Sequence, residues 1–185
     1  MQRLGFFGGC FNPPTIAHFE LALKALDEAK LNKVYFVPMG DYYKKEGLLS
    51  AEIRFEMLEE MVKDDSRLEV SRIQMDQKKN LQAIDTFRLI NKEFRDSENF
   101  FIMGSDNYDR IGSWKDAKEL LASYDYIVLS RGDFKRDNII TIETNDYLQS
   151  MSSSLIREKI ARGESIKGLV TNNVEKYILE KELYK

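Results

Sequence analysis

The chain of 185 residues is poor in cysteine and histidine, with one residue of each type, Cys10 and His18. A lone cysteine cannot form an internal disulfide, so nothing indicates an oxidising compartment and we expect a cytoplasmic protein. No apolar run approaches the roughly 20 residues that a helix needs to cross a bilayer, and no charged-then-apolar leader opens the chain. Association with a membrane is therefore not expected.

The chain also lacks an excess of basic charge. Its 28 Lys and Arg stand against 31 Asp and Glu, for a formal net charge of -3. Proteins that bind a nucleic-acid backbone normally carry a strongly basic domain, so nucleic acid is not an expected partner. Small molecules suit this charge better, and the sequence leaves open whether the chain forms a homo-oligomer.

Two common phosphate-binding patterns are absent as well. The chain contains neither the G-x-G-x-x-G of dinucleotide-binding folds nor the G-x-x-x-x-G-K-[ST] of the P-loop. It also shows no obvious cluster of carboxylates, so no metal ion held by protein ligands alone is expected. A phosphate site in this chain must therefore be built in another way.

The chain does contain an alternation of strand-like and helix-like segments. Short apolar runs rich in branched and aromatic residues occur at 3–7, 33–37, 67–73, 99–103, 124–130 and 138–143. Apolar residues at helical spacing predict helices within 18–29, 57–62, 84–94, 152–162 and 172–182. Strands that are nearly all apolar indicate a parallel sheet covered on both faces. We expect one α/β domain over residues 1–185, a Rossmann-like open parallel sheet with helices on both faces and a small C-terminal helical part at 150–185.

The first expected strand leads into the segment "GGCFNPPTIAH", residues 8–18. Ligands of open parallel sheets bind beyond the carboxyl ends of the strands. Gly8 and Gly9 follow the strand; they suit a tight turn, and their missing side chains also let a ligand approach the backbone and permit unusual dihedral angles. The two prolines before Thr15 make that residue the expected N-cap and place His18 at the third helical position. An imidazole there points toward the free N–H groups of the helix start, which attract an anion.

A second helix start lies near the other end of the chain, in "SMSSSLIREKI", residues 150–160. Its serines supply an N-cap and exposed hydroxyls at Ser153 and Ser154. Arg157 lies about one turn into the helix, where its guanidinium can reach back over the helix start and bind polyphosphate. Taken alone, the segment is more typical of a serine-rich loop before an ordinary helix with a solvated arginine.

Together these segments resemble a known family. "GGCFNPPTIAH" resembles the G-G-x-F-N-P-x-[HT]-x-G-H signature of the nucleotidyltransferase superfamily, in particular of the nicotinate mononucleotide adenylyltransferases. Thr15 replaces the first histidine of the nicotinate enzymes, as in phosphopantetheine adenylyltransferases, and Ala17 replaces the usual glycine. "MSSSLIR" (151–157) resembles I-S-S-[ST]-x-I-R, and "FFIMGSDNYDRIGSW" (100–114) resembles F-I-x-G-x-D followed by a tryptophan. The resemblance spans nearly the whole chain and implies a single nucleotidyltransferase domain.

The resemblance implies an adenylyltransferase that joins ATP to nicotinate or nicotinamide mononucleotide in NAD biosynthesis, with Mg²⁺ carried on the ATP phosphates. The implied catalytic residues are His18, Thr15, Lys44 and Arg157, with His18 donating a hydrogen bond to the α-phosphate. The implied ATP-binding residues are Gly8, Gly9, Cys10, Phe11, Gly104, Asp106, Ser153 and Ser154. The implied acceptor-binding residues are Asn12, Trp114 and Arg131.

The acceptor side matches the family less well than the ATP side. In "VPMGDYYKKEGLLS" (37–50) two tyrosines replace the family's Pro-His pair, and either Lys44 or Lys45 is left to bind phosphate. The family's S-Y-T before a helix is "LQA" at 81–83, without a hydroxyl. Alternatives therefore stay open: another phosphate acceptor such as a phosphopantetheine-like or sugar-linked phosphate, CTP as donor, or a nucleotide-binding module without turnover. A class I aminoacyl-tRNA synthetase shares the histidine signature, but this acidic chain is too short for the usual tRNA-binding parts.

Overall fold

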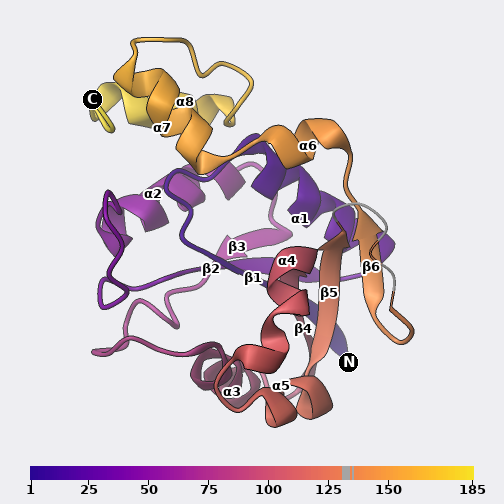
Figure 1. The fold of residues 1–185 in the computed structure, drawn as a ribbon. Coiled ribbons are helices and arrows are strands. Elements are labelled where there is room, and N and C mark those ends of the chain that lie inside the picture. Colours follow the sequence, from indigo (N-terminus) through magenta and orange to yellow (C-terminus); the bar gives the residue numbers. More distant parts are fainter. Residues whose placement is uncertain (131–133, 135) are drawn as a thin grey trace.

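The computed structural model describes residues 1–130, 134 and 136–185. Within this part of the chain six strands form one sheet in the order β3-β2-β1-β4-β5-β6, and each neighbouring pair is parallel (Figure 1). The strands are β1 (Gln2–Gly9), β2 (Lys33–Pro38), β3 (Leu68–Val70), β4 (Ser97–Gly104), β5 (Asp125–Ser130) and β6 (Ile140–Glu143). All six coincide with runs that the sequence marks as strands, so the predicted open parallel sheet is confirmed.

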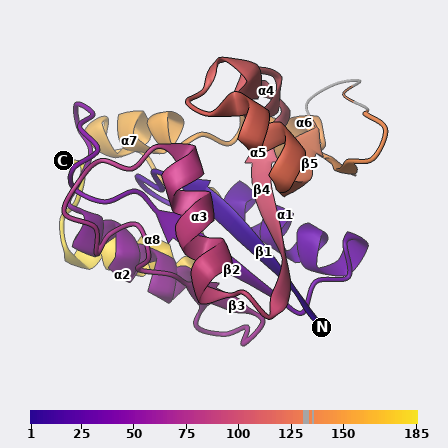
Figure 2. The ribbon, with the colours of Figure 1, turned by 90° about the horizontal axis from the view of Figure 1, so that it is seen from below.

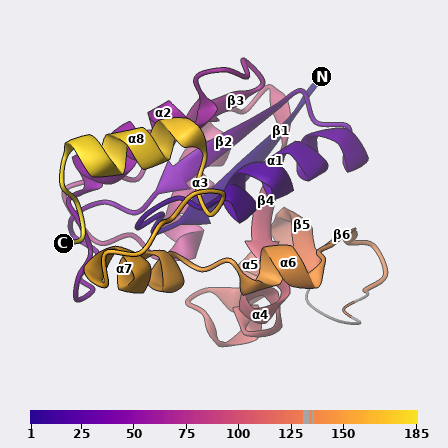
Figure 3. The same ribbon diagram turned by 90° about the horizontal axis from the view of Figure 1, so that it is seen from above.

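Helices cover both faces of this sheet, as predicted. One face carries α1 (Ile16–Glu28), α2 (Ala51–Val62), α7 (Ser153–Ala161) and α8 (Asn172–Glu180), seen from above in Figure 3. The other face carries α3 (Ala83–Glu93), the 3₁₀ helix η1 (Ile111–Ser113) and α5 (Ala117–Ser123), seen from below in Figure 2. Two single-turn helices, α4 (Ser105–Asp109) and α6 (Asp146–Ser150), follow the ends of β4 and β6.

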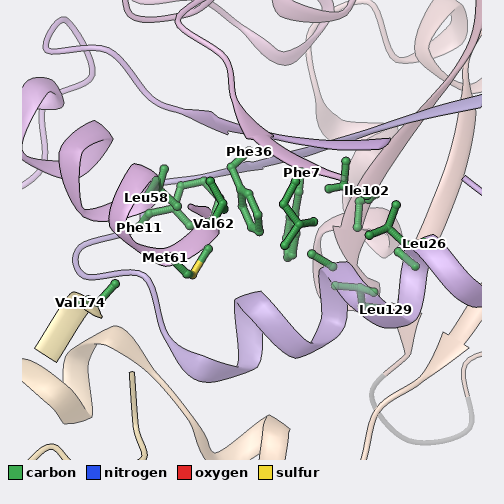
Figure 4. Close-up of a cluster of buried hydrophobic side chains, with 14 of the residues drawn as sticks. Phe7, Phe11, Leu26, Phe36, Leu58, Met61, Val62, Ile102, Leu129 and Val174 are labelled. Carbon is green, nitrogen blue, oxygen red and sulfur yellow. The ribbon is translucent and has the colours of Figure 1, made fainter. Parts of the chain in front are cut away.

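Two hydrophobic clusters hold these layers together, one on each side of the sheet. Successive strand residues point to opposite faces, so Phe7 packs beneath α1 and α2 while its neighbour Phe6 packs toward α3. Figure 4 shows Phe7, Phe11 and Phe36 in the first cluster with side chains from α2 and α8. Both faces of the strands are apolar because both are covered.

The strand order creates a crevice at the carboxyl ends of β1 and β4. The chain leaves β1 toward β2 on one side and returns through α3 to β4 on the other, so the loops that follow β1 and β4 diverge. This arrangement places Gly9 and Gly104, the last residues of these two strands, at the same edge of the sheet.

One sequence expectation is corrected at this edge. Gly8 and Gly9 are not a turn after the strand but the last two residues of β1, paired with Val37 and Pro38 of β2. Neither glycine has a positive φ, so neither supplies an unusual dihedral angle. Their contribution is the space that the missing side chains leave.

The C-terminal helices belong to the same core as α1 and α2. Ile156, Val174 and Ile178 are buried in the first cluster, and the Ile16 N–H donates to the Leu169 carbonyl at 2.8 Å. Figure 3 shows α8 beside α2 and the C-terminus next to α7. Across the described residues, no helix is long and apolar enough to span a bilayer.

Candidate active site

Three pockets lie around the loops at the carboxyl ends of β1, β2 and β4. A central pocket of about 320 Å³ is lined by Gly8, Gly9, Thr15, His18, Gly104 and Asp106 among the residues predicted from the sequence. An apolar pocket of about 140 Å³ shares Gly8 and Gly9 and includes Trp114. A small polar pocket of about 110 Å³ is lined by Cys10, Asn12, Lys45, Ser153, Ser154 and Arg157. The structure therefore brings most of the predicted site residues together.

The glycines differ in what their missing side chains allow. A Cβ added to Gly8 or to Gly104 would meet no atom within 4 Å, so the backbone of both strands is open to a ligand. A Cβ added to Gly9 would lie 2.9 Å from the ring of Phe11, so Gly9 is needed for packing. Glycine thus leaves open space at two of these positions and makes room for Phe11 at the third.

His18 and Thr15 form a reciprocal cap at the start of α1. The Thr15 N–H donates to Nδ1 of His18 at 3.0 Å, and the His18 N–H donates to Oγ1 of Thr15 at 3.3 Å. His18 here takes the place of the Glu or Gln that usually completes such a capping box. Because Nδ1 accepts a hydrogen bond from the Thr15 N–H, the neutral ring carries its own proton on Nε2. The prediction of Thr15 as N-cap and His18 as the third helical residue is confirmed.

The surroundings of His18 keep the ring neutral. Its imidazole packs against Phe11, with ring centroids 5.0 Å apart, and against Phe7, with centroids 5.8 Å apart. Burial lowers the pKa of His18 from 6.5 to about 4, because the charged form loses its hydration. At neutral pH the ring is therefore an uncharged donor at Nε2, on the wall of the central pocket.

Phe11 and Asn12, predicted as ligand-binding residues, turn their side chains inward. Phe11 is 2% exposed and supports the His18 ring, so any contact that it makes with ATP comes from its backbone. The Asn12 amide donates to the Gly47 carbonyl at 2.8 Å, and its Oδ1 accepts the hydroxyl of Tyr184 at 2.8 Å. Asn12 thus joins the first loop to the loop before α2 and to the C-terminus.

The small polar pocket joins two segments that are far apart in sequence. The Ser153 hydroxyl donates to the Pro13 carbonyl at 2.7 Å, and Nη1 of Arg157 donates to the Asn12 carbonyl at 2.7 Å. Nη2 of Arg157 donates to the Ser154 hydroxyl at 3.1 Å. The hydroxyls and the guanidinium at the start of α7 thus lie against the loop after β1.

Of the two candidate lysines, the structure places Lys45 at this pocket. Both lysines are exposed, but Lys44 lines none of the three pockets, whereas Lys45 lines the small polar pocket together with Ser153, Ser154 and Arg157. Arg131, the predicted contact for the acceptor's phosphate, lies outside the described residues.

The apolar pocket contains residues that sequence reasoning missed. Besides Trp114 it is lined by Gln74, Thr86 and Phe87, and Thr86 is 7% exposed in the first turn of α3. The "LQA" segment lacks the family's hydroxyls, but Thr86 supplies one from three residues further on. Its position on the buried face of α3, between the apolar residues Ile84, Phe87 and Ile90, was the available signal.

The central pocket also has walls that were not expected. It is lined, together with the glycines, by Asn107 and Arg110 of the segment after β4, by Thr144 before α6 and by Gln149 of α6. The Arg110 Nε–H donates to the carbonyl of Asp106 at 3.0 Å, which fixes this cation near the predicted ribose-binding carboxylate. Of these residues, only Arg110 had a local signal in the sequence, which is its spacing of one helical turn from Asp106.

Comparison with known proteins agrees with this arrangement. A model of the cytidylyltransferase-like family matches residues 6–159 of the chain. Two proteins named "Probable nicotinate-nucleotide adenylyltransferase", from Shouchella clausii and Acholeplasma laidlawii, are 33% and 34% identical to it. These alignments cover 100% and 96% of this chain and 97% and 95% of the two relatives. The chain belongs to the nicotinate-nucleotide adenylyltransferase family.

The fold is also that of the nicotinate-nucleotide adenylyltransferases. The Plasmodium falciparum nicotinic acid mononucleotide adenylyltransferase complexed with NaAD superposes with a TM-score of 0.83, covering 100% of this chain and 98% of that one. The same enzyme complexed with APC gives a TM-score of 0.82. Sequence identity is 19% and 20%, so these likenesses show the fold alone. The resemblance predicted from the sequence is confirmed, and the chain is a nucleotidyltransferase.

Proposed function

We propose that this protein transfers the adenylyl group of ATP to nicotinate mononucleotide, releasing pyrophosphate, as a step of NAD biosynthesis. The names of its relatives support the reaction class. The observation that carries the proposal is the neutral imidazole of His18, which has a proton on Nε2 and lines the central pocket together with the open backbone of Gly8.

The reaction needs positioning more than proton transfer. A phosphate oxygen of the mononucleotide attacks the α-phosphorus of ATP, and the bond from that phosphorus to the oxygen of the β-phosphate breaks. The attacking group is already an anion, so no general base is required. The protein must hold two anions in line and stabilise the charge that grows on the phosphate oxygens.

The three pockets divide these tasks. We assign the central pocket to the adenosine and α-phosphate, where the Nε2–H of His18 donates to the α-phosphate as the bond breaks. Thr15 holds the ring in the tautomer that has this proton. We assign the small polar pocket to the leaving β- and γ-phosphates, which Arg157, Ser153 and Lys45 bind.

The apolar pocket suits the base of the acceptor. Its walls are largely apolar, with Phe87 and Trp114 as aromatic surfaces and Thr86 and Gln74 as hydrogen-bonding groups. An aromatic ring such as nicotinate can stack there on Trp114. This placement brings the acceptor's phosphate toward Gly8, which the apolar and central pockets share.

Mg²⁺ fits this site as an ion carried by ATP. In the described part of the chain no three His, Cys, Asp or Glu side chains are grouped so that they could hold a metal. Mg²⁺ commonly binds substrate phosphates and water instead of a protein cage, and there it neutralises phosphate charge. We therefore propose that the protein binds the ion through the nucleotide.

We further propose that residues 1–185 form a single nucleotidyltransferase domain, because the C-terminal helices share the core of α1 and α2. Its partners are then small-molecule substrates, without nucleic acid or membrane. The scarcity of cysteine supports a cytoplasmic location.

The test is pyrophosphate release from ATP with Mg²⁺, with nicotinate mononucleotide, nicotinamide mononucleotide and phosphopantetheine offered separately. We expect release with nicotinate mononucleotide and formation of the dinucleotide in equal amount. Release with phosphopantetheine alone, or with none of the three, would contradict the proposal. CTP in place of ATP serves as the donor control.

A further inference from the structure

Among the residues that the structure describes, Arg54 of α2 has the largest side chain that is completely buried. Its exposed fraction is 0%. Its Nε–H donates to the Leu49 carbonyl at 2.9 Å and Nη1 donates to the Cys10 carbonyl at 2.9 Å, while Nη2 donates to the Met39 carbonyl. Each nitrogen of the guanidinium therefore binds the backbone of a different segment.

A buried cation of this kind needs a reason. Burying a charge is unfavourable unless hydrogen bonds and opposite charges compensate for the lost water. Desolvation lowers the pKa of Arg54 from its ordinary value, but a guanidinium stays protonated in proteins. Within the described residues no carboxylate forms an ion pair with it, and the nearby Asp41 uses Oδ1 to accept the Ala51 N–H at 2.6 Å. A neutral apolar side chain would fill the same space at lower cost, so the three carbonyl contacts are the distinctive feature.

The three carbonyls define the two ends of one loop. Met39 follows β2 and Leu49 precedes α2, so they bracket the 40–48 loop, and Cys10 belongs to the loop after β1. One guanidinium thus joins both ends of the 40–48 loop to the first loop. The middle of the 40–48 loop is exposed and carries Lys45 to the small polar pocket.

We infer that Arg54 is a positioning residue, which fixes both ends of the 40–48 loop against Cys10 and so holds Lys45 at the small polar pocket. The inference rests on the proposed function insofar as that pocket receives the phosphates of ATP. Loop ends that are held together leave few conformations for the residues between them. The conformational entropy of Lys45 is then lost on folding instead of on binding, which raises the affinity for ATP.

A positioning role predicts coupling between Arg54 and Lys45 that a merely structural role does not. The experiment is a double-mutant cycle on ATP affinity, measured by titration calorimetry with Mg²⁺ present. Arg54→Lys keeps the charge, but one ammonium cannot reach three carbonyls in the fork geometry of arginine. Lys45→Met removes the cation at the pocket. We expect each single variant to raise the Kd for ATP about tenfold, and Arg54→Lys to add less than about twofold in the Lys45→Met background.

Arg3→Lys is the matched control. Arg3 is half-buried at the start of β1, the opposite end of the sheet, where it donates to Glu98 and to the Ala29 carbonyl. We expect this variant to lower the melting temperature and to leave ATP affinity within about twofold in both backgrounds. An equal loss of affinity from Arg54→Lys with and without Lys45, or a loss matched by Arg3→Lys, would overturn the inference.

A second variant keeps the test decisive if Arg54→Lys does not fold. Two glycines inserted after Glu46 lengthen the exposed part of the loop and leave Arg54 and its contacts in place. We expect the insertion to raise the Kd for ATP about as much as Lys45→Met with little change in melting temperature; unchanged affinity would contradict the inference. Because the readout is binding, an ATP-binding chain that releases no pyrophosphate would contradict the proposed function while the cycle still decides the role of Arg54.

Discussion

Replacement of His18 by alanine tests the centre of the proposed mechanism, because the ring has two separate hydrogen-bonding roles. Nδ1 accepts the N–H of Thr15 at 3.0 Å and completes the cap of α1. Nε2 carries the proton and has no hydrogen-bond partner within the described residues, so it is available to the α-phosphate. His18→Ala removes both roles, and their effects can be measured separately.

The two losses differ in size and in kind. A lost helix cap lowers stability by about 1 kcal/mol, which in a chain of this length lowers the melting temperature by about 2–4 °C. A lost preorganised donor lowers turnover by about 10² to 10³, or about 2.7–4 kcal/mol in the transition state. We therefore expect a folded variant whose kcat for pyrophosphate release falls by about 10² to 10³ while its KM for ATP changes much less.

His18→Glu separates the cap from the donor. Glu is a natural third residue of a capping box, so its carboxylate keeps an acceptor for the Thr15 N–H but has no proton to donate at neutral pH. We expect this variant to unfold near the wild-type temperature and to release pyrophosphate at least as slowly as His18→Ala. Turnover within about threefold of wild type in either variant, measured at saturating ATP and acceptor, would refute the reasoning.

Four further predictions concern the titration of His18, the stability that depends on it, the glycines of β1 and Trp114. Because His18 is the only histidine in the chain, NMR can follow the titration of its ring directly. We expect a titration midpoint at about pH 4 without ligand, and a midpoint near pH 6.5 would contradict the desolvated neutral ring. This pKa lies below the unfolded value of about 6.5, so the stability contributed by His18 is full above pH 6.5 and falls by up to about 3 kcal/mol toward pH 4. Denaturant unfolding of His18→Glu should lack this fall in stability between pH 6.5 and pH 4. Gly8→Ala should leave the melting temperature unchanged but raise the KM for ATP at least about tenfold, because its methyl group enters the open space proposed for the ligand. Gly9→Ala should instead destabilise the fold, because its methyl group meets the ring of Phe11. Wild-type kinetics of Gly8→Ala would argue against ligand approach at this strand. Trp114→Ala should raise the KM for nicotinate mononucleotide about tenfold through lost stacking and leave the KM for ATP within about twofold; equal effects on both would remove Trp114 from the acceptor site.

Local rules explain why much of the site could be read from the sequence. Two prolines before Thr15 leave only one place for α1 to begin, and a helix start determines which residue lies at its third position. The same reasoning located the start of α7 and the backward reach of Arg157. Short apolar runs marked all six strands, because burial of a parallel sheet on both faces leaves a strong and short-range pattern.

The expectations that were incomplete concern side-chain direction. Phe11 and Asn12 belong to the recognised motif, but their side chains support His18 and the neighbouring loops instead of lining the site with free groups. Thr86 and Arg54 carry no motif of their own and were not singled out. Whether a polar side chain in a helix faces a pocket or the solvent depends on the segments that pack over it, which no local pattern specifies.

The sequence by itself therefore determined the order of the elements, the helix starts and the pairing of Thr15 with His18, because hydrogen bonds and steric limits between residues a few positions apart decide these features. Only the tertiary structure decided that Arg157 meets the carbonyl of Asn12, 145 residues away, and that Lys45 instead of Lys44 reaches the polar pocket. These contacts depend on the diverging loops of β1 and β4 and on the buried Arg54 that joins three chain segments. Such contacts form only after the sheet and its helices have packed, so the physical reason for them lies in the whole core and not in any one segment.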